Sequence, residues 1–282
     1  MRKSVLITGC SHGGAGNQLA KEYCSRGLHV FATARNIEAM NDLDLPGITR
    51  LELDVTNIES IRTARDQVKS ILGVNTGLDL LVNNAGIWST TPALDHELSE
   101  IRSIFETNVF GMMAMVQEFM PLLTLSQDAC IVNVGSIGGL MPYAFGSTYN
   151  ASKAAVHSYS DTLRLELRPL GIQVITVILG GVKTNIFTRP PKPLPDNSYY
   201  RPIEAIFRGV RSGQVHKATP RDKFAREFVD ATLRPSTPRH LALAFGSIVV
   251  PWVTWLVPGF LINFRIVSNF GAGAVRIPRE AS

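Results

Sequence analysis

Short apolar runs typical of β-strands alternate along this chain with longer stretches of helical period, and this alternation restricts the fold more than any other feature. Apolar strands separated by helices are typical of a parallel sheet that is covered on both faces. The predicted strands are Val5–Thr8, His29–Thr33, Arg50–Leu53, Leu78–Asn83, Ala129–Val134 and Val174–Ile178, and the predicted helices include Asn17–Arg26, Ile58–Leu72 and Ser99–Leu123.

Right-handed crossovers between such strands predict an α/β fold: a single doubly wound, Rossmann-type domain with a mostly parallel sheet. A chain of 282 residues fits one such domain, with a core large enough to need no disulfide or metal. We expect residues 1–190 to form the dinucleotide-binding and catalytic core. Residues 191–282 are expected to add a substrate-loop region and an apolar C-terminal extension of the same domain. Ligands of such sheets bind beyond the carboxyl ends of the strands.

A glycine-rich turn follows the first predicted strand. Its sequence is Thr8-Gly9-Cys10-Ser11-His12-Gly13-Gly14-Ala15-Gly16, and a predicted helix comes next. Glycine allows a tight turn and lets the backbone approach a pyrophosphate, whose charge is favoured at a helix N-terminus. The turn therefore predicts a dinucleotide site, with contacts from Gly9, Ser11, Gly14 and Gly16.

The end of the second predicted strand indicates which dinucleotide binds. Enzymes that prefer NAD usually carry a carboxylate there, whereas this chain has Ala34 followed by Arg35. A guanidinium pairs well with a 2′-phosphate, so NADPH/NADP+ is the predicted cofactor. Asp54, Asn84 and Gly86 end the next two strands and are further predicted contacts, although ordinary strand-end turns also use such residues.

A tyrosine and a lysine four residues apart predict the catalytic pair. Tyr149 and Lys153 share one helix face at this spacing, and a nearby ammonium group favours the phenolate and so lowers the phenol pKa. Ser136 ends an apolar strand, where its hydroxyl could hold a substrate carbonyl. Asn108 lies inside a predicted helix, where asparagine is unfavourable and therefore asks for a functional reason.

Over residues 1–190 the sequence resembles the classical short-chain dehydrogenase/reductase family. The matching motifs are the glycine loop, Asn83-Asn84-Ala85-Gly86, and the tetrad Asn108, Ser136, Tyr149 and Lys153. The resemblance implies that Tyr149 is the general acid for ketone reduction. It further implies that Lys153 lowers the pKa of Tyr149 and binds the nicotinamide ribose, that Ser136 orients the carbonyl, and that Asn108 anchors a proton-relay water. Cofactor contacts from Tyr149, Lys153, Val182 and Thr184 complete the implied site.

Two departures from the family pattern concern the cofactor loops. The glycine turn is one residue longer than usual, with four residues between Gly9 and Gly14. The Pro-Gly pair that usually follows the sixth strand is replaced by Leu179-Gly180. Both changes leave the predicted catalytic groups in place, and both predict altered loop geometry.

Within the family, the chain is similar to a fungal branch of NADPH-dependent 1-acyldihydroxyacetone-phosphate reductases. This implies reduction of a ketone on a lipid-like substrate, with 1-acyl-dihydroxyacetone phosphate as the candidate. The alternative is a tailoring ketoreductase of fungal secondary metabolism that acts on a polyketide, terpenoid or steroid-like ketone. Residues 183–282 carry 15 Lys and Arg against 6 Asp and Glu, which favours an anionic ligand or surface. The residues predicted to bind a substrate phosphate are Arg201, Arg208, Arg211 and Lys217.

Residues 241–263 contain no charged side chain but do contain two tryptophans and two prolines. Three interpretations are open: a substrate lid or subunit contact, docking on a membrane or lipid-droplet surface, and a membrane span, which Pro251 and Pro258 disfavour. We expect an intracellular protein, cytoplasmic or peripheral on the endoplasmic reticulum or lipid droplets, and the family implies a homo-oligomer.

Composition narrows the remaining function classes. The three cysteines are widely spaced and indicate reduced thiols, and the histidines show no metal-ligand spacing, so we predict no metal site. No basic motif of a nucleic-acid module accompanies the positive charge. A non-catalytic nucleotide sensor and an enzyme working in the oxidative direction remain alternatives, and the complete tetrad weighs against the sensor.

Overall fold

The computed structural model describes residues 3–185, 193–205, 218–234, 238–258 and 261. Its centre is a seven-stranded sheet in the order β3-β2-β1-β4-β5-β6-β7, with every neighbouring pair parallel. This confirms the predicted doubly wound, Rossmann-type topology. The strands are β1 Ser4–Thr8, β2 His29–Ala34, β3 Ile48–Glu52, β4 Leu80–Asn83, β5 Cys130–Val134, β6 Gln173–Leu179 and β7 His240–Leu243.

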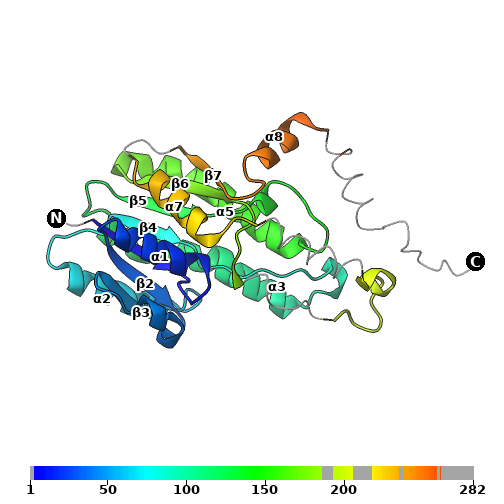
Figure 1. Ribbon diagram of the computed structural model, residues 1–282, viewed down its shortest axis with the longest axis horizontal. Coiled ribbons are helices and arrows are strands. Elements are labelled where there is room, and N and C mark those ends of the chain that lie inside the picture. Colours follow the sequence, from blue (N-terminus) through cyan, green and yellow to red (C-terminus); the bar gives the residue numbers. More distant parts are fainter. Residues whose placement is uncertain (1–2, 186–192, 206–217, 235–237, 259–260, 262–282) are drawn as a thin grey trace, which may run out of the picture.

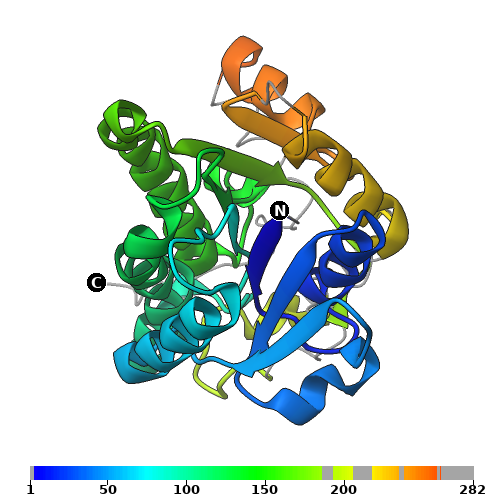
Figure 2. The same ribbon diagram turned by 90° about the vertical axis from the view of Figure 1, so that its left-hand side faces the viewer.

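Helices cover both faces of this sheet, as Figure 2 shows. One face packs against α1 (Ala15–Ser25) and α7 (Arg221–Thr232), and the other packs against α2 (Ile58–Leu72), α4 (Gly111–Leu123) and α5 (Ser147–Leu167). Successive residues of a strand point to opposite faces. The two separate apolar cores follow from this alternation along strands that are apolar on both sides.

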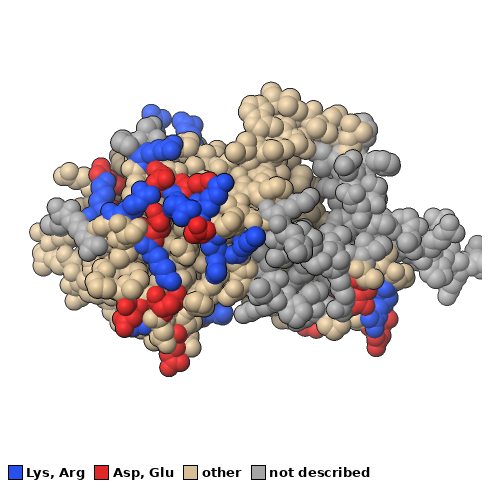
Figure 3. All heavy atoms as spheres, viewed as in Figure 1, with Lys and Arg blue, Asp and Glu red and all other residues tan. Residues whose placement is uncertain are grey.

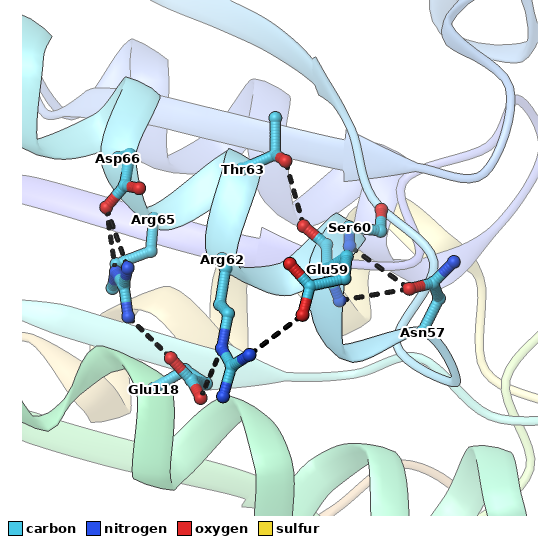
Figure 4. A network of polar contacts seen from close by, with 8 residues as sticks. All are labelled: Asn57, Glu59, Ser60, Arg62, Thr63, Arg65, Asp66 and Glu118. Carbon is cyan, nitrogen blue, oxygen red and sulfur yellow. Dashed lines mark hydrogen bonds and ion pairs between the residues drawn. The ribbon is translucent and has the colours of Figure 1, made fainter.

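Helix α2 is fixed to α4 by a polar network on the outer surface (Figure 4). The Glu118 carboxylate of α4 accepts hydrogen bonds from Arg62 and Arg65 of α2, and its side chain is only 15 % exposed. The Asn57 side chain begins α2 by accepting hydrogen bonds from the backbone N–H groups of Glu59 and Ser60. The network holds the two helices together beside the third and fourth strands.

The helix predicted over Ser99–Leu123 is interrupted at its centre. Helix α3 (Leu98–Phe105) passes into a π-helical turn, η3 (Glu106–Phe110), before α4 begins. Isolated π-turns inside α-helices are frequent at functional sites. The turn contains Asn108, the residue whose position in a helix asked for a functional reason.

In its described residues, the charge-free run 241–263 contains the end of a strand and a short helix. Its first residues belong to β7, where Leu241 and Leu243 are buried and pair with β6. The helix α8 (Val249–Leu256) follows after a turn. Neither element was predicted from the sequence, because the run was interpreted as one uncharged stretch. Strand β7 and helix α7 thus extend the sheet and its cover with residues from beyond position 190.

The strand ends determine where a site can lie. In Figure 1 the N-terminus is at the left, and α3 and the segment 193–205 lie toward the right.

Within the described residues, no helix is both long and apolar enough to cross a membrane.

Candidate active site

The glycine turn after β1 has a geometry that side chains would block. Gly9 has a φ of +75°, and a Cβ atom there would lie 2.9 Å from the Cα atom of Ala85. A Cβ atom on Gly16 would lie 2.6 Å from the Gly9 carbonyl oxygen. The Gly14 N–H donates to the Ser11 carbonyl at 3.0 Å and closes the turn. Glycine is therefore required for the close approach of α1 to the strand ends.

The longer glycine loop is held by contacts with the segment that follows β2. The His12 N–H donates to the Ala39 carbonyl at 2.7 Å, and its Nδ1 atom lies 3.1 Å from an Asp42 carboxylate oxygen. Burial raises the pKa of Asp42, but hydrogen bonds from Lys21, His12 and Asn17 outweigh burial and lower the pKa to about 2. An ionised Asp42 therefore fixes the longer loop to the segment after β2.

The segment after β6 returns to the same loop. The Asn185 N–H donates to the Gly13 carbonyl at 3.3 Å, and its side-chain amide donates to the His12 carbonyl at 3.1 Å. Val182 and Thr184, the predicted cofactor contacts, precede this anchor, and Val182 is buried. At the unusual Leu179-Gly180 position, a Cβ atom on Gly180 would lie 2.0 Å from the Phe245 carbonyl oxygen. Glycine at position 180 leaves room for the turn after β7 to pass close to the end of β6.

Arg35 and Asp54 lie at the ends of neighbouring strands but differ in the contacts that their side chains make. Arg35 is exposed just after β2, and the part of the chain that the structure describes offers it no ion pair. Asp54 accepts hydrogen bonds from the Thr56 N–H and hydroxyl at 2.9 and 2.8 Å through one carboxylate oxygen. This oxygen forms the ordinary strand-end turn that the sequence left open as an alternative, and a contact of Asp54 with adenine stays a prediction.

Asn84 and Gly86 join the glycine turn to the catalytic residues. The Asn84 side-chain amide donates to the carbonyls of Thr8 and Gly9 at 2.8 and 3.2 Å. A Cβ atom on Gly86 would lie 3.2 Å from the Asn108 Oδ1 atom and 3.6 Å from the Lys153 Nζ atom. Gly86 therefore lies directly against two of the predicted tetrad residues.

Asn108 uses its side chain to hold the chain after β4. Its Oδ1 atom accepts from the Ile87 N–H at 2.8 Å, and its Nδ2 atom donates to the Ile87 carbonyl and to the Ser152 hydroxyl, both at 3.0 Å. The residue is 2 % exposed. These bonds explain why an amide is present in a helix at this point, and the anchoring of a relay water stays a prediction.

Ser136, Tyr149 and Lys153 are brought together by β5 and α5. The Ser136 hydroxyl caps the turn η4 (Ile137–Gly139) by accepting from the Gly138 N–H at 3.1 Å, and it also contacts the Tyr149 phenol. The Lys153 Nζ atom lies 5.9 Å from the centre of the Tyr149 ring and donates to the Val134 carbonyl at 2.8 Å.

The protonation of this group differs in one respect from the sequence prediction. Burial raises the pKa of Tyr149, and the hydrogen bond with Ser136 lowers it by less. We expected a lowered pKa because of Lys153. Burial also lowers the pKa of Lys153, to about 8. The phenol is therefore protonated at neutral pH, as a proton donor must be, while a pKa nearer the operating pH would make proton transfer more efficient.

Two residues that the sequence analysis did not single out complete this group. The His157 Nε2 atom accepts a hydrogen bond from the Ser136 N–H at 3.1 Å, and the Ser152 hydroxyl donates to the Tyr149 carbonyl at 2.7 Å. Both belong to α5, and His157 follows Lys153 by four residues. Its helical spacing from Tyr149 and Lys153 was the available signal. Among the described residues there is no cluster that could hold a metal.

The chain is similar to known proteins over most of its length. The family model for short chain dehydrogenases matches residues 3–193. The chain is 44 % identical to short-chain dehydrogenase virD of Hypocrea virens over 98 % of this chain and 95 % of that protein. It is 39 % identical to the NADPH-dependent 1-acyldihydroxyacetone phosphate reductase of Schizosaccharomyces pombe, over 81 % of this chain and 76 % of that protein.

A solved structure extends the match to the whole fold. A short-chain dehydrogenase from Streptomyces avermitilis has a TM-score of 0.78 with 29 % identity, covering 97 % of this chain and 98 % of its own. The chain therefore belongs to the short-chain dehydrogenase family and is an oxidoreductase that acts on C=O and CH–OH groups.

Proposed function

We propose that this enzyme reduces a ketone on an apolar substrate to a secondary alcohol, with NADPH as cofactor and Tyr149 as the proton donor. The observation that carries the proposal is the meeting of the Ser136 hydroxyl, the Tyr149 phenol and the Lys153 ammonium group at the carboxyl ends of β4 and β5. Each of these groups serves a separate part of the reaction.

The Ser136 hydroxyl accepts from the Gly138 N–H, so its own proton is available to a substrate carbonyl or to the Tyr149 oxygen. The Tyr149 phenol is protonated at neutral pH, since an ordinary tyrosine has a pKa near 10 and burial raises the pKa of this one. Lys153 has one N–H bond committed to the Val134 carbonyl and two left for other acceptors. When bound, the nicotinamide supplies the hydride, and the protein supplies position and charge.

The residues present fit a phosphorylated dinucleotide. The glycine turn is a cradle that Cβ atoms would fill, since such an atom on Gly9 would lie 2.9 Å from the Ala85 Cα atom and one on Gly16 would lie 2.6 Å from the Gly9 carbonyl oxygen. The start of α1 favours the charge of a pyrophosphate. Arg35 is exposed at the end of β2, where a guanidinium would bind the 2′-phosphate that distinguishes NADPH from NADH.

Arg35→Ala tests the cofactor. A charge-assisted hydrogen bond contributes about 1.5–3 kcal/mol, so the KM for NADPH should rise roughly 10- to 150-fold while the KM for NADH changes little. Nicotinamide absorbance during turnover measures both. An equal change for the two cofactors would contradict the assignment.

The described part of the substrate side favours an uncharged substrate. Arg201, one of the residues predicted to bind a substrate phosphate, is already paired with Asp196 and with Glu204, the latter at 2.7 Å. Two carboxylates thus neutralise the guanidinium. The other predicted phosphate ligands, Arg208, Arg211 and Lys217, lie outside the described residues.

Aromatic rings lie on three segments near the catalytic residues. The Trp88 indole N–H donates to the Tyr143 hydroxyl at 2.8 Å, and the Phe145 and Tyr200 rings meet edge to face at 5.5 Å. Phe145 lies four residues before Tyr149 and has a φ of +66°, a conformation that costs an aromatic residue energy. Flat apolar substrates pack well against such rings.

We therefore place an unphosphorylated polyketide, terpenoid or steroid-like ketone first among the substrate classes, and 1-acyl-dihydroxyacetone phosphate second. The second candidate is supported by similarity to the Schizosaccharomyces pombe reductase. The test compares NADPH oxidation with the phosphorylated lipid, its dephosphorylated form, a steroid ketone and an aromatic polyketide mimic, using Tyr149→Phe as the inactive control. A KM at least tenfold lower for the phosphorylated lipid than for its dephosphorylated form would reverse this order.

Helix α8 offers an apolar surface beside the site. Trp252, Trp255 and Leu256 are exposed, and Figure 3 shows no charged side chains over this helix. With eight residues the helix is about 12 Å long, too short to span a bilayer of about 30 Å. We propose that it contacts a second subunit or a membrane or lipid-droplet surface. Light scattering of Trp252→Ser and Trp255→Ser variants tests the first partner, and flotation with anionic liposomes tests the second.

A further inference from the structure

A buried histidine holds the backbone of the serine that faces the substrate. His157 lies on the same face of α5 as Tyr149 and Lys153, and its Nε2 atom accepts a hydrogen bond from the Ser136 N–H at 3.1 Å. The residue is 7 % exposed. None of the roles assigned above to Ser136, Tyr149 and Lys153 uses this imidazole.

The turn after β5 is built closely around this ring. A Cβ atom on Gly135 would lie 2.2 Å from the His157 Nε2 atom, and one on Gly139 would lie 2.7 Å from its Cε1 atom. The two glycines flank Ser136 and η4 and leave just enough room for an imidazole. The ring therefore determines where the turn, and with it Ser136, lies relative to α5.

The hydrogen bond fixes the protonation of the ring. Because Nε2 accepts, the neutral imidazole carries its proton on Nδ1. The charged groups that face the ring are Lys153 and Asp161 from α5 and His240 from β7, and residues 134–139 contribute none. Burial, followed by Lys153 and His240, lowers the pKa of His157 to about 4, and Asp161 opposes them. The acceptor on Nε2 is consequently available throughout the neutral pH range.

We propose that His157 is a positioning residue for ketone reduction: it holds the Ser136 backbone so that the Ser136 hydroxyl is directed at the substrate carbonyl and the Tyr149 phenol. This inference rests on the proposed function. The chain of contacts is short, because the hydroxyl itself is held from its other side by the Gly138 N–H. Displacement of a positioned group by about 1 Å can cost about 100-fold in rate.

Two substitutions separate positioning from simple packing. His157→Leu fills a similar volume but lacks an acceptor, whereas His157→Gln can place a side-chain oxygen near the former Nε2 position. We expect His157→Leu to lower kcat roughly 10- to 100-fold with the KM for NADPH changed less than about twofold, and His157→Gln to recover most of kcat. His29→Gln, at the amino end of β2, is the control for loss of a histidine.

A second measurement needs no turnover. Contact with Ser136 lowers the pKa of the Tyr149 phenol, so His157→Leu should raise that pKa and His157→Gln should not. Ultraviolet difference titration against Tyr149→Phe isolates the phenol. If wild-type enzyme reduces no ketone in the panel, the proposed function fails while this titration still tests His157.

The opposite results would overturn the proposal. They are a His157→Leu enzyme with wild-type kcat and an unchanged Tyr149 titration, or equal losses in the leucine and glutamine variants that follow the melting temperature alone. Either would show that His157 only fills space beneath η4.

Discussion

Replacement of Asn108 by leucine tests whether the π-helical turn exists to hold the chain after β4. Leucine has nearly the shape of asparagine but makes none of its three hydrogen bonds to Ile87 and Ser152. Asn108 and Ser152 are buried, so each lost bond costs at least about 1 kcal/mol and the free energy of unfolding should fall by about 3 kcal/mol or more. With an unfolding entropy of about 2 cal/mol/K per residue, the melting temperature of this 282-residue chain should fall by about 5 °C.

Activity should fall further than stability alone explains. Ile87 follows Gly86, which lies against Asn108 and Lys153. A shift of this segment would displace the groups around Lys153, and kcat should drop roughly 100-fold at a temperature where the variant is fully folded. Differential scanning fluorimetry and NADPH oxidation, performed on the same preparation, give the two quantities.

Asn133→Leu is the matched control. Asn133 is fully buried in β5 and makes two side-chain hydrogen bonds, to Asn83 and to Ser160, both on the interior side of the site. It should lose a similar free energy of unfolding with a much smaller loss of kcat. The reasoning is refuted if Asn108→Leu is as stable and active as wild type, or if the two variants lose kcat equally.

Three further predictions concern titration, backbone strain and thiol reactivity. Unfolded His157 takes up a proton below about pH 6.5, but the folded residue does so only near pH 4. The free energy of unfolding should therefore fall by up to about 3 kcal/mol as the pH falls across that range. Urea titrations of His157→Gln should lack this part of the loss. Gly9→Ala should weaken NADPH binding about tenfold or more, through strain and a backbone clash. The control is Gly27→Ala, which has a φ of +86° and nothing within 4 Å, and which should change only stability, by about 1–2 kcal/mol. Equal NADPH affinities of the two variants would contradict this. Burial raises the pKa of Cys10 to about 12, so mass spectrometry after mild alkylation should find the partly exposed Cys24 modified and Cys10 unmodified.

Most of the fold was predictable from the sequence because each strand and helix is marked by a local pattern of residues. Six strands were predictable from short apolar runs between helices, and all six are present in the sheet. The seventh, β7, was missed because the run 241–263 was interpreted as one uncharged stretch, although Gly246 and Ser247 separate the strand from α8. The break at η3 was also missed, since the helix over Ser99–Leu123 was predicted as continuous and only the unfavourable Asn108 marked the π-turn.

The residues of the candidate site were more predictable from the sequence than the contacts between them. Tyr149 and Lys153 follow from helical spacing, and Ser136 follows from its place at a strand end. The contact between Ser136 and His157 depends on two glycines that let a turn fold over a ring 21 residues later, which no local pattern encodes. The direction of the Tyr149 pKa was wrong for a related reason: burial is a property of the folded core, and here it outweighs the hydrogen bond with Ser136.

The substrate side shows most clearly why a count of charges is a poor guide to a ligand. Residues 183–282 carry 15 Lys and Arg against 6 Asp and Glu, which by itself indicates an anionic ligand. The structure pairs Arg201 with two carboxylates and Arg226 with Asp222, so these cations are partly neutralised by neighbours within five residues. A cation so paired must give up part of its contact with the carboxylate before it binds a substrate phosphate, and this lowers the gain from phosphate binding by the small free energy that an exposed ion pair contributes. An Asp196→Asn, Glu204→Gln double variant would free Arg201. If that variant gained at least tenfold in affinity for a phosphorylated ketone over its dephosphorylated form, then the ion pairs, rather than the absence of cations, set the preference for uncharged substrates.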